Sequence, residues 1–434
     1  MAMGPFLMSA QPPNKTRTLW LIGILHAFTH IYQMALLPLY LGIQRDLKLN
    51  SVEQATLLVT VMGFAYFIPS YGLGVLADRL SRKKLLAVGL ALNGTGFVLL
   101  ALAPNYPCAL ASVVLAGLGG SFYHPSATAL IARLFPKGRG HALGLVGIGA
   151  SVGFFIGPFY SGWRAVSSGN WRTPVLELGL LGIIAASVFT WLADEEQKSL
   201  STTNDSSDST HAKGQKLFPT MALWAFFFGA SFAFSLRDFA GSAMATSTSL
   251  FLQKAHRFDP KLAGIALSGI FLASAISNPV LGRFSDGARL RWISYVLILA
   301  SFCISLFPRV SVTWMVPTLL AYGFFFMASY PMTEAAVMES VHDSVRGRSF
   351  GLFITVGGLV SNVAHWLVGK WVHNLGPKAA IPESYLQLYG IMTLMVLASL
   401  AGLPCLRAIR KREAELPLNT SLSQASTLPS ATSQ

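Results

Sequence analysis

The chain has 434 residues, of which 53% are hydrophobic and only 12% are charged, and its formal net charge at pH 7 is +14. Soluble domains carry about 25% charged residues. The charges here are bunched, so that repeated apolar windows of about 20 residues are left, each long enough to cross a bilayer as a helix. This composition excludes a soluble protein. The positive charge does not indicate nucleic-acid binding, because Lys and Arg fall in short clusters between apolar segments, as in cytoplasmic loops.

The apolar windows predict an all-α membrane protein with twelve transmembrane helices. They lie at 18–43, 53–77, 84–103, 108–134, 141–164 and 174–193, and then at 218–252, 261–284, 290–308, 313–340, 348–371 and 385–407. The seventh window is too long for one straight span, so we expect it to tilt or to continue as helix outside the lipid.

These windows define five segments. They are a cytoplasmic N-terminal segment (1–17), a first six-helix bundle (18–193), a polar cytoplasmic linker (194–217), a second six-helix bundle (218–408) and a disordered cytoplasmic tail (409–434). Twelve spans place both termini on one side of the membrane, and that side carries about twice as many Lys and Arg residues as the other. Because positive charge accumulates inside, we expect both termini in the cytoplasm, in a bacterial inner membrane.

The cysteines and the known short motifs give no sign of an enzyme or a metalloprotein. Cys108, Cys303 and Cys405 lie in apolar surroundings without a CxxC pair, so we expect no disulfide framework, no metal site and no cofactor. The sequence contains no GxxxxGK[ST] loop and no HExxH motif, which argues against ATP-driven pumping and against hydrolysis. The apolar run from Trp20 is too long for the core of a cleavable signal.

A basic loop follows the second window, and a relative follows the eighth, about half the chain later. The first copy contains Gly74, Asp78, Arg79 and Arg82; the second contains Gly282, Asp286 and Arg289. Further similar stretches recur at nearly the same offset. This pattern indicates two parallel repeats related by an axis along the membrane normal, as in a two-halved transporter.

The first copy of this loop resembles the loop signature of the major facilitator superfamily, and the resemblance covers roughly residues 17 to 410. Ser81 stands where the family usually has Gly. The resemblance implies a monomeric transporter with a midplane cavity. It also implies a latch, in which Asp78 accepts hydrogen bonds from a helix of the other bundle while Arg79 and Arg82 engage carbonyls or anionic lipid. The alternative is a loop that only anchors the topology.

The fifth window contains a second signature. Its members are Gly144, Gly153, Gly157, Pro158 and Gly162, and Ser161 stands where a further Gly is usual. The spacing resembles the fifth-span motif of antiporters in this superfamily and implies export. Glycines repeated every four residues lie on one helix face and allow a neighbouring helix to approach closely, which is also the simpler interpretation. Pro158 frees a backbone carbonyl and allows bending.

Two stretches resemble the fosmidomycin-resistance type of drug/proton antiporter. They run from His30 to Tyr40 in the first window and from Gly119 to Pro125 in the fourth. That type commonly has acidic residues at two positions where this chain has Met34 and Ser126. These departures leave the substrate open.

Ionisable and aromatic residues inside the windows are the candidate working groups, because a charged side chain in a span costs a few kcal/mol. His26 and His30 share one helix face. Thr29 and His30 correspond, at the repeat offset, to Arg237 and Asp238. The candidate residues of the substrate cavity are His26, His30, Tyr32, Tyr123, His124 and Arg237. Two alternatives to a role in the cavity stay open. In one, Arg237 and Asp238 only form an ion pair with each other. In the other, His124 only donates a hydrogen bond to a carbonyl freed by Pro125.

Asp238 and Glu334 are the first candidates for carrying protons, and His30 is the third. An acidic group inside a span is a natural proton-binding group, and an unperturbed imidazole changes charge at about pH 6.5. Glu177 and His365 are interpreted as structural.

Together these features predict a secondary active transporter that exports a small organic molecule or drug in exchange for protons, by alternating access. Its partners would be the substrate, protons and membrane lipids. One alternative is a proton-coupled importer of a small organic anion. The other is a non-transporting sensor or scaffold on a transporter fold.

Overall fold

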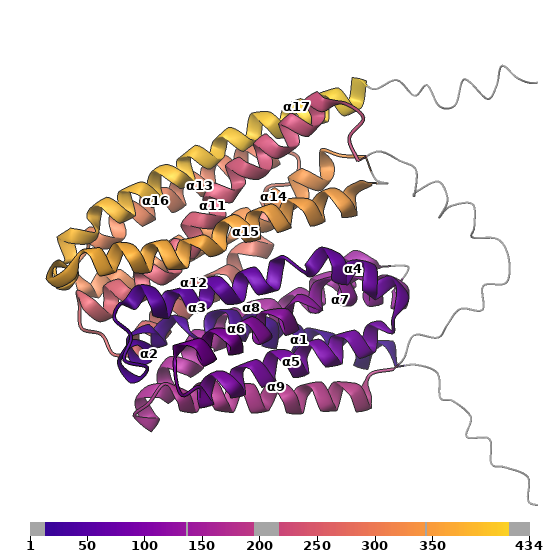
Figure 1. Ribbon diagram of the computed structural model, residues 1–434. Coiled ribbons are helices and arrows are strands. Elements are labelled where there is room, and N and C mark those ends of the chain that lie inside the picture. Colours follow the sequence, from indigo (N-terminus) through magenta and orange to yellow (C-terminus); the bar gives the residue numbers. More distant parts are fainter. Residues whose placement is uncertain (1–13, 136–137, 195–216, 343–344, 416–434) are drawn as a thin grey trace, which may run out of the picture.

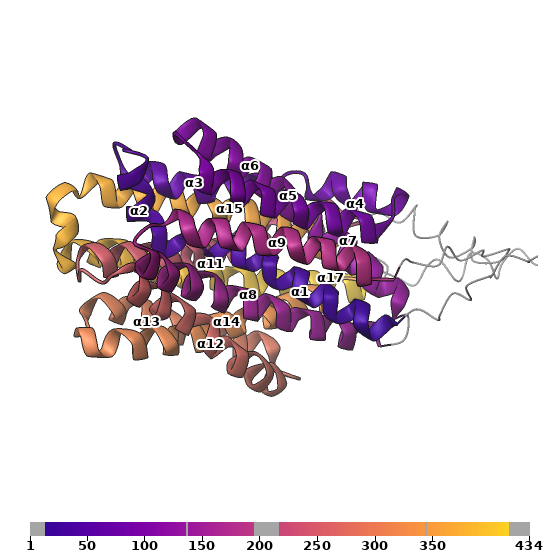
Figure 2. The ribbon, with the colours of Figure 1, turned by 90° about the horizontal axis from the view of Figure 1, so that it is seen from below.

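The computed structural model describes residues 14–135, 138–194, 217–342 and 345–415, apart from a few side chains next to the loops, including those of Asp78 and Arg139. Every regular element in this part of the chain is a helix. The helices form two elongated bundles that lie side by side, one from each half of the sequence (Figure 1). Seen from below, the helices of each bundle run roughly along one common direction (Figure 2). The predicted all-α fold class is therefore confirmed.

The first bundle is built from ten helical segments. They are α1 (Lys15–Met34), η1 (Leu37–Leu39), α2 (Tyr40–Asp46), α3 (Val52–Phe67), α4 (Ser70–Arg79), α5 (Arg82–Leu102), α6 (Tyr106–Ser121), α7 (Tyr123–Leu134), α8 (Arg139–Ser168) and α9 (Arg172–Leu192).

The second bundle follows the same plan. Its segments are α11 (Met221–Lys254), α12 (Pro260–Phe284), α13 (Arg289–Leu306), η2 (Phe307–Arg309), α14 (Val312–Glu339), α15 (Arg346–Asn374), η4 (Gly376–Ala380), η5 (Pro382–Tyr385), α16 (Leu386–Ala398), η6 (Ser399–Ala401) and α17 (Gly402–Glu415).

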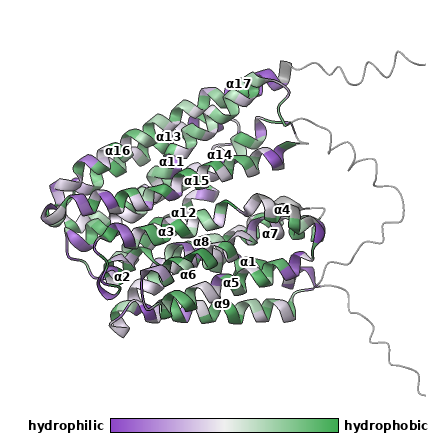
Figure 3. Cartoon of the chain, viewed as in Figure 1, coloured by the Kyte–Doolittle hydropathy of each residue, from purple (hydrophilic) through white to green (hydrophobic). Residues whose placement is uncertain are grey.

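In the described part of the chain, ten helical stretches are long and apolar enough to cross a membrane. The two others that complete a twelve-span arrangement are the shorter apolar α3, continued by α4, and the long α11. Apolar residues dominate both bundles, and polar residues gather at the helix ends and loops (Figure 3). The arrangement fits the predicted two bundles of six spans.

Several predicted boundaries shift in the structure. The seventh span is a single helix of 34 residues, α11. The fourth span is interrupted: α6 ends at Ser121 and α7 begins at Tyr123, because Pro125 cannot donate to the carbonyl four residues earlier. The last helix, α17, continues to Glu415, beyond the expected boundary at 408. Basic residues in its last turns favour this extension, since they complement the helix dipole.

The bundles contact each other near one end. We call the end where α1 begins and α17 ends the terminal end, and the other the opposite end; the latter lies on the left in Figure 1. Toward the opposite end, Gln253 of α11 donates to the carbonyl of Pro38 (3.2 Å), and the hydroxyls of Tyr40 and Thr246 lie 3.2 Å apart. Thr246 in turn contacts His365 Nδ1 at 2.6 Å. The first two bonds join α11 to the segment after α1, and the third joins α11 to α15 within the second bundle.

Two helix pairs complete this closure. Between α3 and α15, Thr60 donates to the carbonyl of Asn362 (2.7 Å), and the Trp366 indole donates to Glu53 (2.6 Å). Between α8 and α12, Gly162 lies so close to Pro260 that a Cβ would overlap its carbonyl. Small residues therefore allow the two bundles to meet backbone to backbone at the opposite end.

The glycine face of α8 packs on α1 within the first bundle. A Cβ at Gly149 would overlap the backbone of Gly23, and one at Gly153 would overlap the backbone of Ala27. A Cβ at Gly157 would lie 2.9 Å from the carbonyl oxygen of Ile31. The close approach expected from the four-residue spacing occurs, and its partner is the helix that carries His26 and His30.

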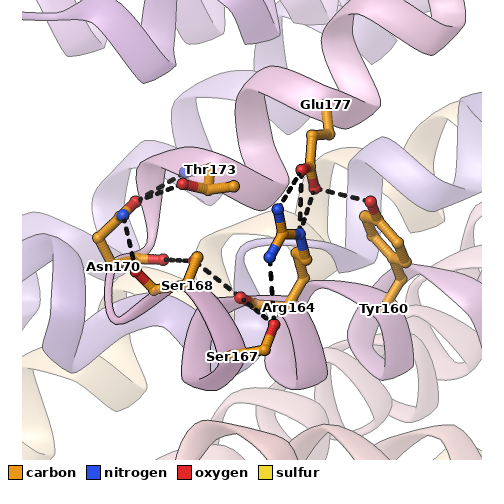
Figure 4. A network of polar contacts seen from close by, with 7 residues as sticks. All are labelled: Tyr160, Arg164, Ser167, Ser168, Asn170, Thr173 and Glu177. Atoms are coloured by element: carbon orange, nitrogen blue, oxygen red, sulfur yellow. Dashed lines mark hydrogen bonds and ion pairs between the residues drawn. The ribbon is translucent and has the colours of Figure 1, made fainter.

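A polar network ties α8 to α9 at the opposite end (Figure 4). Arg164 donates to both oxygens of Glu177, with Nη2 2.8 Å from Oε1. Tyr160 donates to Glu177 Oε2 at 2.7 Å. All the contacts that Figure 4 shows for this carboxylate are made with these two side chains. Glu177 thus has the structural surroundings expected for it.

Candidate functional site

Three histidines from two helices meet in the middle of the first bundle. His26 and His30 come from α1, one turn apart, and His124 is the second residue of α7. Their nearest ring nitrogens all lie within 4.8 Å of one another. His26 Nε2 and His30 Nε2 are 3.1 Å apart. We call these three residues the histidine cluster.

The other ring nitrogens of the α1 histidines have fixed partners. His26 Nδ1 lies 2.9 Å from the carbonyl oxygen of Val146 in α8. His30 Nδ1 lies 2.8 Å from Gln33 Oε1. Val146 offers only a carbonyl oxygen, so His26 Nδ1 carries the proton and donates, and His26 Nε2 presents a lone pair to His30. The tautomer of His30 follows the Gln33 amide: when the amide oxygen faces the ring, His30 Nδ1 donates and the two Nε2 lone pairs face each other.

Aromatic rings surround the cluster. Tyr123 stacks on His26 with ring centroids 4.7 Å apart, and its hydroxyl donates to the carbonyl of Ile22 at 3.0 Å. Phe154 of α8 lies 4.1 Å from the His30 ring and stacks on Phe271 of α12 at 4.9 Å. This Phe154–Phe271 pair spans the two bundles beside the cluster.

The three imidazoles differ in exposure. His30 is buried with 8% of its surface exposed, His26 is partly buried, and His124 is exposed. His124 has this exposure although the rings of His26 and Tyr66 lie 5.4 Å and 6.2 Å from its own. The cluster can therefore be reached through His124.

A second polar centre lies in the other bundle. Arg237 of α11 is 1% exposed, and its guanidinium donates to Asp238 Oδ1 from Nε (2.9 Å) and from Nη2 (2.7 Å). Nη1 donates to the Thr333 hydroxyl of α14 at 2.9 Å and to the Ser329 carbonyl at 3.3 Å. The guanidinium also lies over the Tyr330 ring, 4.1 Å from its centroid. Arg237 is thus fully engaged inside the second bundle.

Glu334 lies one turn beyond Tyr330 on α14, within electrostatic range of Arg237 and Asp238. It is partly buried and has no hydrogen bond or ion pair with another residue in the described part of the chain. Asp238, by contrast, is held by two hydrogen bonds, and its side chain is 15% exposed. The two acidic candidates therefore differ: one is paired and the other is not.

Tyr32 lies on another side of α1. Its hydroxyl donates to the carbonyl of Leu178 in α9 at 3.0 Å, and its ring packs against Phe97 of α5 at 4.3 Å. It is 1% exposed. These contacts join α1 to α5 and α9, away from the cluster.

The structure places the loop residues as follows. Gly74 and Asp78 lie in α4, but their side-chain surroundings are outside the described part of the structure. Arg79 is the last residue of α4 and is exposed. Arg82 is the first residue of α5 and is buried. In the second loop Gly282 lies in the last turn of α12, and Arg289 pairs with Asp286 (3.1 Å) and with Glu339 of α14 (2.9 Å). The second loop is thus tied to its own bundle.

The chain is similar to known proteins along most of its length. Residues 19–365 match the sequence profile described as Major Facilitator Superfamily, so the chain belongs to this family. It is 29% identical over 237 residues to the quinolone resistance protein NorA of Staphylococcus aureus, covering 54% of this chain and 57% of that protein. It is 35% identical over 168 residues to the multidrug resistance protein MdtG of Yersinia enterocolitica, covering 38% and 39%. The chain therefore spans little more than half the length of NorA.

Two solved structures show the same fold. A bacterial homologue of the human lysosomal transporter Spinster, in an inward-facing and unoccupied conformation, superposes with a TM-score of 0.76 at 15% identity, covering 94% of this chain and 99% of that one. A mutant of the nucleoside transporter NupG gives 0.70 at 16% identity, covering 90% and 100%. With the family match over residues 19–365 and its apolar helices, the protein is an integral membrane protein of the Major Facilitator Superfamily.

Proposed function

We propose that this transporter exports a small organic molecule in exchange for protons, with Glu334 as the proton-carrying residue. The observation that carries the proposal is the difference between two neighbouring carboxylates. Asp238 is neutralised by Arg237 in the same helix, whereas Glu334 has no ion-pair partner in the described part of the chain. An unpaired acid inside a span is costly when charged, so proton uptake relieves that cost.

The Arg237–Asp238 pair supports this role for Glu334. A buried arginine that stays charged makes the site sensitive to the charge of a third group nearby. Loss or gain of a proton on Glu334 changes the net charge of the centre. The helices α11 and α14 can pack on the first bundle in two ways, and a change in net charge shifts the equilibrium between these two arrangements. A ligand that binds one state more tightly has the same effect.

We propose that the terminal end faces the cytoplasm and is the open end of this conformation. The hydrogen bonds of Gln253, Thr60 and Trp366 close the bundles toward the opposite end. The exposed His124, in the middle of a span, supports access from the terminal side. Substrate would then enter from the cytoplasm, contacting His30, His124 and the aromatic rings near them.

The direction of transport rests on the relatives. NorA and MdtG are named resistance proteins, against a quinolone and against multiple drugs, respectively. The spacing of Gly144, Gly153, Gly157, Pro158 and Gly162 also resembles that of antiporters. Both points favour export over import.

The experiment measures accumulation of a fluorescent hydrophobic cation, and of a quinolone, in drug-sensitive bacteria that express the protein. We expect lower accumulation with the wild type than with empty vector, and loss of the difference when a protonophore collapses the proton gradient. Glu334→Gln should accumulate substrate as the empty vector does.

The matched control is Glu177→Gln. Glu177 is also an acidic residue within a span, but Arg164 and Tyr160 hold it far from the polar centre in α11 and α14. This variant should export normally at equal expression. Equal loss of export in both variants, or protonophore-resistant export, would contradict the proposal.

A further inference from the structure

We infer that the histidine cluster is a binding site for a divalent transition-metal ion, with His26, His30 and His124 as ligands. This goes beyond the proposed export of an organic molecule, and it concerns binding, which is measurable without transport. Imidazole nitrogen is a preferred ligand of zinc, copper, nickel and cobalt ions. Two histidines four residues apart on one helix face are a common half of such a site.

The distances fit a metal centre. With Zn–N bonds of about 2.05 Å, tetrahedral geometry places two ligating nitrogens roughly 3.3 Å apart. His26 Nε2 and His30 Nε2 are 3.1 Å apart. The largest separation in the cluster is 4.8 Å. His124 is the exposed member, so its side chain is the one of the three that is best placed to rotate and close this gap.

The protonation states fit as well. Val146 accepts from His26 Nδ1, and Gln33 Oε1 lies 2.8 Å from His30 Nδ1. In the tautomer in which both Nδ1 atoms donate, both Nε2 atoms present lone pairs to each other. Two facing lone pairs at this distance repel unless something positive lies between them. A metal ion satisfies both at once. Metal-ligating histidines almost always donate the other ring N–H to a carbonyl or similar oxygen, which is the arrangement here.

The cluster supplies three ligands from the described residues, which would leave a fourth position of a tetrahedral ion for another group. Three protein ligands with one free position are typical of sites that bind and exchange a further ligand. Tyr66, whose ring lies 6.2 Å from that of His124, has a buried hydroxyl for which the described residues offer no partner. A metal-bound water or a donor atom of a chelating molecule is the kind of group that it would contact.

The test is titration of the purified full-length protein in detergent with Co²⁺ and then Zn²⁺, using an affinity tag without histidines. We expect one Co²⁺ per chain, the intense visible absorption of a four-coordinate Co²⁺ ion, and its loss on addition of one equivalent of Zn²⁺. His124→Ala should weaken binding at least about tenfold, since even outer partners of metal ligands contribute 10–100-fold.

Two further variants complete the design. His373→Ala is the matched control, because His373 is exposed in the last turn of α15 at the opposite end, and it should bind as the wild type does. Gln33→Leu removes only the partner of His30 Nδ1, so it should weaken binding while keeping one ion per chain. The fully loaded Gln33→Leu variant should still show the absorption spectrum of a four-coordinate Co²⁺ ion.

Two results would overturn the inference. One is the absence of saturable Co²⁺ binding to folded wild-type protein, in which case the two Nε2 atoms share a proton instead. The other is binding that His124→Ala and Gln33→Leu leave unchanged, which would place the ion elsewhere. Neither result bears on export, since drug accumulation in cells is a separate measurement.

Discussion

Replacing Asp238 with Asn should destabilise the protein through the arginine that it leaves behind. Arg237 is 1% exposed and loses its only ion-pair partner in the described part of the chain. Removing one partner of a buried ion pair costs about 3–5 kcal/mol. Because Ser329 and Thr333 still accept hydrogen bonds from the guanidinium, we expect a cost near the low end, about 3 kcal/mol.

The assay is equilibrium unfolding in mixed micelles with increasing denaturing detergent, followed by the fluorescence of the nine tryptophans. Replacing both partners, as Arg237→Met with Asp238→Asn, should restore the free energy of unfolding to within about 1 kcal/mol of the wild type, because no buried charge is left unpaired. The control, Glu177→Gln, breaks a pair whose side chains are 32% and 30% exposed. Such a pair contributes about 1 kcal/mol or less.

Two results would refute this reasoning. An Asp238→Asn variant as stable as the wild type would show that Arg237 does not depend on its neighbour. A double variant as unstable as the single one would show that the cost arises from packing rather than from an unpaired charge.

Three further predictions concern packing and closure. Gly153→Leu should lower the free energy of unfolding by about 1–3 kcal/mol, because its side chain overlaps the α1 backbone, whereas Gly144→Ala, which enters open space, should not. Tyr32→Phe should cost about 1 kcal/mol by removing the bond to Leu178, with the KM for exported drug unchanged; a changed KM would instead place Tyr32 in the substrate cavity. Gln253→Ala removes a hydrogen bond between the bundles. The loss of about 1 kcal/mol should make the backbone amides of η1 exchange hydrogen about fivefold faster. Unchanged exchange would show that Gln253 does not contribute to closure.

Much of the fold could be predicted from the sequence because a lipid-facing helix must be apolar along its whole length. The windows therefore located the spans, and the four-residue spacing of Gly149, Gly153 and Gly157 identified a packing face. The boundaries were less certain. A proline interrupts the fourth span, and a basic last turn extends α17. Hydrophobicity alone predicts neither of these local features.

The site could be predicted only in pieces. His26 and His30 form a pair because they are one turn apart, but His124 is almost one hundred residues away and joins them only when α7 packs against α1. Helix geometry did contain a signal for Tyr32. It lies two residues after His30, roughly 200° around the helix, and its contacts with Leu178 and Phe97 are on that side.

The second polar centre required tertiary packing as well. The sequence offered an Arg237–Asp238 pair as one alternative, and the structure contains it. Adjacent residues on a helix point in different directions, so the sequence alone could not decide between that pair and a bound substrate. In the structure α14 also brings Ser329 and Thr333 against the guanidinium, so packing between α11 and α14 completes its set of acceptors. The same packing sets Glu334 beside it without a partner, a distinction that the sequence does not contain.

The measurement that tests the central claim most directly is proton movement in proteoliposomes that enclose a pH-sensitive dye, with the protein oriented inside out. A panel of hydrophobic cations, organic acids and phosphonates is added outside. Our account predicts that a transported compound raises the lumenal pH, since protons leave as the substrate enters, in the wild type and in Glu177→Gln but not in Glu334→Gln. A fall in lumenal pH on addition of substrate would mean that protons move with it, and would replace export by proton-coupled uptake.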